Sequence, residues 1–231
     1  MIGFRVKHKH WAGFTLLEIM VSILIFSVIL TTVFASFRTV FFSTDKIDTG
    51  LDLYGMVGSC LNRISLDLSG INIAQPPAYT KPEFDSPPDP YRVIGDQSDV
   101  SSGDFSRLRL ASRSHVPLDG SVHESVAEIV YYVSGDESEG YTLRRSDRLY
   151  PYTPPDEQAG DPVLCENLKS LLITYFDKEG TVHDTWDSES SDTDYATPKA
   201  INIVLEVGDE ESPPMVFETM VMLPVMREAM E

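Results

Sequence analysis

The chain has 231 residues, with 36 aspartates and glutamates against 18 lysines and arginines, so its formal net charge is −18. This length suits one medium soluble domain with an appendage. A surface this acidic repels polyanions, which argues against nucleic acid as a partner, and also against acidic lipid except through the basic first thirteen residues.

An apolar run follows that basic segment, from Phe14 to Phe37, and its only formal charge is Glu18. A helix of this length covers roughly 36 Å, enough to cross the hydrocarbon core of a membrane. Basic residues are in excess before the run, so we expect the N-terminus in the cytoplasm and the C-terminal domain in the periplasm. A cleaved secretory signal has a small-residue site after the run, which this sequence lacks, so an uncleaved signal anchor is the plain alternative.

The residues after the span continue the helical pattern. Apolar side chains recur at steps of three and four, the period of one helix face: Ile47, Leu51, Tyr54, Val57, Leu61, Ile64 and Leu68. No proline occurs before Pro76, so one helix is predicted from about Phe14 to about Leu68. Glycines at 50, 55 and 58 are expected to weaken or kink it, since each costs up to ~1 kcal/mol against alanine. We divide the segment into a transmembrane half, 14–37, and a periplasmic half, 38–72.

The remainder, residues 73–231, has the pattern of a β-rich domain. Six prolines between Pro76 and Pro90 exclude helix and central strand, so this stretch is predicted to be an extended loop. Short alternating runs beyond it predict seven or eight strands. One hairpin is expected over residues 168–186, with Gly180 available for a positive φ in its turn. The predicted fold class is α+β, a long helix packed on antiparallel β-sheets.

The start of the apolar run carries a motif: a short basic leader, then Gly13, Phe14, Thr15, two leucines and Glu18. It resembles the processing site of type IV prepilins and type II secretion pseudopilins. The resemblance implies a pilin-like fold and cleavage of the leader, residues 1–13, between Gly13 and Phe14 by the prepilin peptidase. It also implies methylation of the new amine of Phe14.

Glu18 needs an explanation, because an acidic side chain at the centre of a membrane helix costs about 2.5–3.5 kcal/mol. The N-terminal amine of Phe14 on a neighbouring subunit can neutralise it where Coulomb attraction is weakly screened. Glu18 is therefore predicted to form an assembly ion pair, a role the resemblance also implies. The plain alternative is an acid that snorkels to the interface.

The C-terminal half is similar to the minor pseudopilin J family of type II secretion. The similarity rests on the apolar strand 199–207 and on the following residues: Leu172, Tyr175, Phe176, Asp177, Gly180, Trp186 and Pro198. Thr197 departs from the family, where leucine is usual. The resemblance implies a structural subunit at the tip of the periplasmic pseudopilus, which starts assembly with minor pseudopilins I and K and contacts secreted proteins. A minor type IV pilin and a membrane-anchored periplasmic enzyme or receptor remain as alternatives.

Two cysteines, Cys60 and Cys165, would face an oxidising compartment, where they can pair. A bridge closing a loop of about a hundred residues could add ~2–4 kcal/mol. The alternative is two buried thiols that behave as small hydrophobes.

An acidic stretch, residues 183–195, offers oxygen ligands of the kind that calcium takes: Asp184, Asp187, Glu189, Asp192 and Asp194. It lacks the EF-hand spacing, so a solvated loop is the favoured interpretation. The histidines at 115, 123 and 183 show no metal-ligand spacing, and no nucleophile elbow is evident. We therefore expect no metal, no cofactor and no enzymatic activity.

Overall fold

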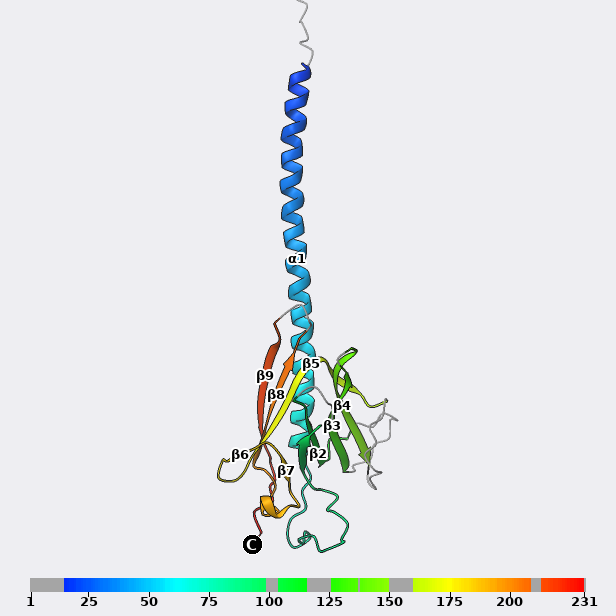
Figure 1. Cartoon of the computed structure of the whole chain (residues 1–231), viewed down its shortest axis with the longest axis vertical. Helices are drawn as coiled ribbons and strands as arrows, with labels where there is room; N and C mark the ends of the chain where they lie inside the picture. Colours follow the sequence, from blue (N-terminus) through cyan, green and yellow to red (C-terminus); the bar gives the residue numbers. More distant parts are fainter. Residues whose placement is uncertain are drawn as a thin grey trace, which may run out of the picture. The chain divides into compact units, whose positions relative to one another are not determined.

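The structure is a computed structural model that describes residues 15–98, 104–115, 126–136, 138–149, 160–208 and 213–230, with only the helical backbone given for 39–49. The chain divides into two compact units, Met1–Leu53 and Tyr54–Glu231. Helix α1, Leu16–Ser69, contributes residues to both units (Figure 1). The predicted processing site, Gly13 and Phe14, lies outside the described residues, as do His123 and the whole basic leader, residues 1–13.

Helix α1 is continuous over 54 residues, which confirms the prediction of one long N-terminal helix. The predicted weak points, Gly50, Gly55 and Gly58, lie inside it without interrupting it. A side chain at any of the three would meet open space, so packing does not require glycine there. Gly70 directly follows the helix and donates its N–H to the carbonyl of Leu66 at 3.0 Å.

The described residues form nine strands and one short 3-10 helix. The strands are β1 Ile94–Gln97, β2 Ser106–Ser112, β3 Ala127–Asp136, β4 Gly140–Leu149, β5 Val163–Phe176, β6 Val182–His183, β7 Trp186–Asp187, β8 Ala200–Val207 and β9 Met215–Met222, and the 3-10 helix is η1 Ser191–Thr193. The strands form one sheet in the order β7-β1-β2-β3-β4-β5-β8-β9, with β6 paired to β5. The α+β class and the antiparallel pairing are as predicted, but one sheet replaces the several expected.

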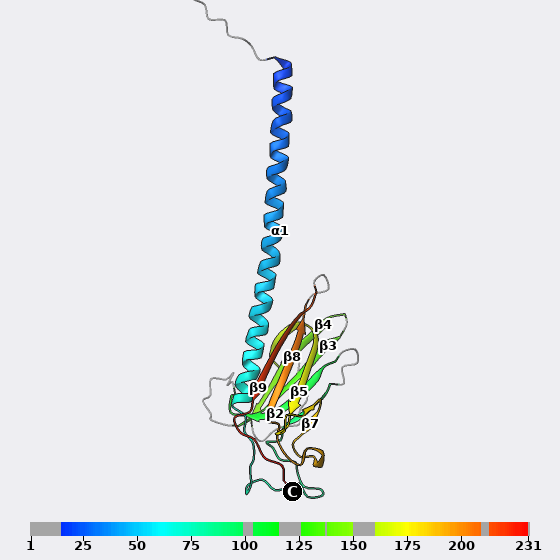
Figure 2. The ribbon, with the colours of Figure 1, turned by 90° about the vertical axis from the view of Figure 1, so that its left-hand side faces the viewer.

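The sheet is curled, as Figure 2 shows. The pairing of β4 with β5 carries register shifts, and such bulges bend and twist a sheet. Across the curl, Phe105 forms an isolated parallel bridge with Leu171, whose N–H donates to the carbonyl of Asp104 at 3.1 Å. Because the one sheet curls around the core, no second sheet is needed to cover it.

The last turns of α1 close this core. Val57, Cys60, Ile64 and Leu68 are buried, at steps of three and four residues. Of the predicted apolar stripe, the side chain of Ile47 lies outside the described residues, and within the larger unit Tyr54 is 57% exposed, so burial begins at Val57. Within the larger unit, the ring of Tyr54 meets Phe217 of β9 edge-on at 5.1 Å, and Figures 1 and 2 both show these turns beside β9.

The predicted hairpin over 168–186 is correct at its turn and wrong at its end. Gly180 has a φ of 90°, and β5 pairs with β6 through Tyr175 opposite His183. Trp186, however, leaves the hairpin and pairs in β7 with Gly95 of β1. Its indole N–H donates to the carbonyl of Ala196 at 3.1 Å, which fixes it there. Gly95 must be glycine, because a Cβ would overlap the hydroxyl of buried Tyr175.

Candidate functional site

The first turn of α1 is closed by Thr15 and Glu18. The N–H of Glu18 donates to Thr15 Oγ1 at 3.3 Å, and the N–H of Thr15 donates to Glu18 Oε2 at 3.5 Å. This reciprocal pair is a capping box, in which the two side chains satisfy backbone donors at the helix start. Sequence reasoning missed this role, although the threonine–x–x–glutamate spacing before an apolar run signals it.

The capping box leaves the carboxylate of Glu18 with further accepting capacity, because an ionised carboxylate has about four lone-pair sites. Glu18 is exposed, so a cation from outside the chain can reach it. The predicted assembly ion pair is compatible with this geometry and stays a prediction, since Phe14 lies outside the described residues.

The following segment, Leu16–Arg38, is the one described stretch of helix that is long and apolar enough to cross a membrane. Its side chains are exposed, so this chain alone does not cover them. The hydroxyls inside it donate to carbonyls of the preceding turn, for example Ser22 to Glu18 at 2.7 Å and Thr31 to Ser27 at 2.7 Å. The polar side chains are thereby satisfied within the helix, as hydrocarbon surroundings require.

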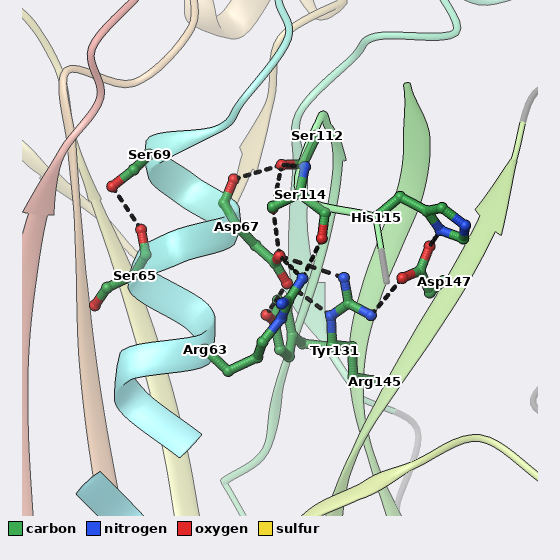
Figure 3. A network of polar contacts seen from close by, with 10 residues as sticks. All are labelled: Arg63, Ser65, Asp67, Ser69, Ser112, Ser114, His115, Tyr131, Arg145 and Asp147. Carbon is green, nitrogen blue, oxygen red and sulfur yellow. Dashed lines mark hydrogen bonds and ion pairs between the residues drawn. The ribbon is translucent and has the colours of Figure 1, made fainter. Parts of the chain in front are cut away.

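At the other end of α1, a buried carboxylate links the helix to the sheet (Figure 3). Asp67 is fully buried and forms ion pairs with Arg63 Nη2 at 2.5 Å and with Arg145 Nε of β4 at 2.7 Å. It also accepts hydrogen bonds from the hydroxyls of Tyr131 in β3 and of Ser114, the latter at 2.6 Å. The helix is thus joined to β3, β4 and the end of β2 through one side chain.

The network continues outward from Arg145. Its Nη1 reaches Asp147 Oδ2 at 2.7 Å, and Asp147 Oδ1 lies 2.6 Å from His115 Nδ1. Burial would lower the pKa of Arg145, but Asp67 and Asp147 outweigh it and raise that pKa. Burial, together with the charge of Asp67, raises the pKa of Tyr131, so its hydroxyl remains a donor. Two acids therefore face two permanent cations, and the cluster is neutral when His115 is neutral.

One residue of this network has a weak signal in the sequence. Asp67 lies three residues after Ile64 and next to Leu68, so it falls on the apolar face of the helix. An acid on a buried helix face needs a cationic partner. The partner, Arg145, is 78 residues away, and no local pattern identifies it.

Cys60 and Cys165 are free thiols in the structure, and both are buried. Burial raises the pKa of Cys60 to about 12, with a smaller effect from Cys165, and burial also raises the pKa of Cys165 to about 11. Thiols in this state are poor nucleophiles at neutral pH. The bridge and the two buried thiols are the two alternatives that the sequence leaves open.

The acidic stretch accepts backbone hydrogen bonds both from within itself and from the proline-rich loop 76–90. Glu189 Oε2 accepts from the N–H of Asp89 at 2.9 Å, and Asp187 Oδ1 accepts from the N–H of Glu189 at 2.9 Å. In the part of the chain that the structure describes, no three histidine, cysteine or acidic side chains gather as a metal would require. His115 and His183 each face an aspartate, Asp147 and Asp177.

The chain matches two protein-family models. Residues 59–219 match type II secretion system protein J, and residues 12–34 match the prokaryotic N-terminal methylation motif. No curated protein sequence matches the chain significantly. Among solved structures, the chain is similar to the type IV-like pilin TTHA1219 from Thermus thermophilus, with 10% identity and a TM-score of 0.41, over 75% of this chain and 97% of that chain.

The protein J model covers more than half of the chain and spans the end of α1 and the strands of the sheet. The methylation motif covers the predicted processing site and most of the apolar span, which indicates anchoring in the inner membrane. The chain therefore belongs to the type II secretion system protein J family, and its role is that of a minor pseudopilin.

Proposed function

We propose that the chain is made as a precursor, cut between Gly13 and Phe14 by the prepilin peptidase, and methylated on the new amine of Phe14. The match of residues 12–34 to the methylation motif supports this proposal. After cleavage, the mature chain starts two residues before helix α1, and Thr15 and Glu18 cap its first turn. The domain after residue 37 lies in the periplasm, as the basic leader favours.

The mature subunit then enters a pilus-like fibre through its exposed apolar helix. Glu18 pairs with the amine of Phe14 on a neighbouring subunit, because both charges lie in a medium that screens them weakly. The fibre, rather than the chain itself, covers the apolar side chains from Leu16 to Phe37. The protein J family match supports a place at the pseudopilus tip, with minor pseudopilins I and K as partners and contact with secreted proteins.

One observation carries this function: the same chain combines the methylation motif at 12–34 with the protein J match at 59–219. A structural subunit of this kind acts by assembly and needs no catalytic residues or cofactor. The alternative, a periplasmic protein held by an uncleaved membrane anchor, does not explain why both matches occur in one chain.

The test is deletion of the gene that encodes this chain in its own host, followed by assays of secretion and of surface piliation. We expect secretion to fail while piliation is normal, and full-length wild-type chain to restore secretion. Loss of piliation with normal secretion would instead indicate a minor type IV pilin. Normal behaviour in both assays would contradict an assembly role in either fibre.

A further inference from the structure

Strand β9 forms one edge of the sheet, since it pairs with β8 alone in the sheet order. It keeps regular register with β8 over eight residue pairs, from Val207↔Met215 to Ala200↔Met222. The opposite edge, β7, is only two residues long. Soluble proteins shorten, charge or bulge their edge strands to prevent pairing with other chains. Strand β7 is short, whereas β9 is long and regular, and one charged side chain, Glu218, is its single device of this kind.

The backbone of β9 has donors and acceptors that point away from the sheet. Leu223 N–H donates to the carbonyl of Lys199 at 3.0 Å, so this pair is hydrogen-bonded toward β8. Hydrogen-bonded and non-hydrogen-bonded pairs alternate along an antiparallel ladder. Val216, Glu218, Met220 and Met222 therefore direct their N–H and C=O groups toward the open edge.

The same four residues also present their side chains on the outer face. Val216, Met220 and Met222 are 64%, 54% and 67% exposed. Glu218 stands among them, held by Asn202 Nδ2 at 2.9 Å. The only charged side chains on β8 and β9 are Glu206 and Glu218, both acidic, and the connection between these strands adds Asp209, Glu210 and Glu211 in sequence.

We propose that the open edge of β9 receives an extended segment of a different pseudopilus subunit, which adds a strand to the sheet. The segment alternates apolar side chains, which cover Val216, Met220 and Met222, with lysine or arginine, which neutralises Glu218. Main-chain hydrogen bonds supply affinity in such strand addition, and alternate side chains supply specificity. A second copy of this chain is excluded as the occupant, because its charge of −18 and its own carboxylates would meet the same acidic edge.

The structure offers a matched pair of variants. Met220→Pro removes an N–H that points toward the open edge and breaks no bond to β8, and proline is tolerated on edge strands in this orientation. Met220→Ile keeps both the N–H and an apolar side chain. A third variant, Glu218→Lys, reverses the exposed charge without touching the backbone.

The experiment places a photo-crosslinking amino acid at position 216 of the full-length chain in its own host. Adducts are identified by mass spectrometry in the wild-type background and with each variant. We expect an adduct with a cationic extended segment of another pseudopilus subunit. The yield of this adduct falls by about tenfold or more with Met220→Pro and with Glu218→Lys, and is unchanged with Met220→Ile. A tenfold loss of affinity corresponds to about 1.4 kcal/mol.

An adduct with a second copy of the chain, or equal adducts in Met220→Pro and Met220→Ile at equal protein levels, would overturn the proposal. So would the absence of any adduct in a strain that secretes normally. If Met220→Pro lowers the protein level, Glu218→Lys decides alone, because its side chain faces solvent. The docking proposal rests on the proposed function for the identity of the fibre, but different experimental results would refute the two claims. If the proposed function fails, deletion of the chain leaves secretion intact, whereas failure of the docking surface leaves the deletion phenotype unchanged.

Discussion

At the residue scale, two ion pairs of the larger unit differ in their surroundings. Asp67 and Arg145 are buried, with side chains 0% and 5% exposed, whereas Lys178 and Glu228 are 59% and 68% exposed. Removing one partner of a buried pair leaves the other charge without water or counter-ion. The same change at the surface exposes the remaining charge to solvent, which screens it.

We predict that Asp67→Ala lowers the free energy of unfolding of the larger unit by about 3–5 kcal/mol, because the buried Arg145 and its neighbour Arg63 are then left with Asp147 as their one acidic counter-ion. The matched control, Lys178→Ala, should change it by less than about 1 kcal/mol. Urea denaturation followed by circular dichroism measures both. Equal effects of the two substitutions would show that the network of Figure 3 does not anchor the helix end.

The two thiols give a second prediction, which depends on pH. With pKa values of about 12 and about 11, Cys60 and Cys165 stay neutral in the fold, and the ordinary thiol value is 9.0. Their contribution to stability is therefore complete below pH 9 and is lost as the pH rises through 11 and 12. We expect iodoacetamide at pH 8 to modify neither thiol in the folded chain.

Unfolding in urea without a reductant then exposes both thiols, and mass spectrometry should find two added groups. Finding none after unfolding would contradict the free thiols and establish the alternative, a bridge formed in the oxidising compartment. Modification of the folded chain at pH 8 would contradict their burial.

At the element scale, α1 gives Glu18 two separable tasks. Its side chain caps the first turn through Thr15, and its charge is proposed to bind the amine of a neighbouring subunit. Glutamine also completes a capping box but carries no charge. Leucine does neither.

We predict that Glu18→Gln and Glu18→Leu both insert and are cleaved normally, yet both lower secretion by about tenfold or more, because loss of one ion-pair partner strands the other. Membrane level, processing and secretion are measured in strains that carry only the variant. Normal secretion with glutamine and poor secretion with leucine would assign Glu18 to capping alone.

The sequence sufficed for elements whose cause is local. The long helix follows from the apolar period and the absence of proline, and the turn at Gly180 follows from the need for a positive φ. The pairing of Trp186 with Gly95 was missed, because contacts between residues 91 positions apart have no local signature. The single sheet was missed for the same reason, since bulges and the bridge from Phe105 to Leu171 decide its curl.

The candidate site divides in the same way. The motif around Gly13, Phe14 and Glu18 is contiguous, so it could be recognised directly. The exposure of Tyr54 could not be predicted, because periodicity shows which side chains share a helix face but not where the sheet begins to cover that face.

At the scale of the whole molecule, the chain combines an exposed apolar helix with a strongly acidic β-rich unit. The acidic charge keeps the larger unit soluble and repels further copies of itself. Both properties suit a subunit that is present in few copies and meets different neighbours.

The central claim is that the chain is processed as a pilin-like subunit, and the N-terminus of the mature protein tests it most directly. The full-length chain is extracted from membranes of its own host, and its N-terminal peptide is identified by mass spectrometry, with Gly13→Val as the control that should retain the leader. The account predicts a mature chain that begins at Phe14 with a methylated amine. A chain that still begins at Met1, or an equal extent of cleavage in Gly13→Val, would contradict it.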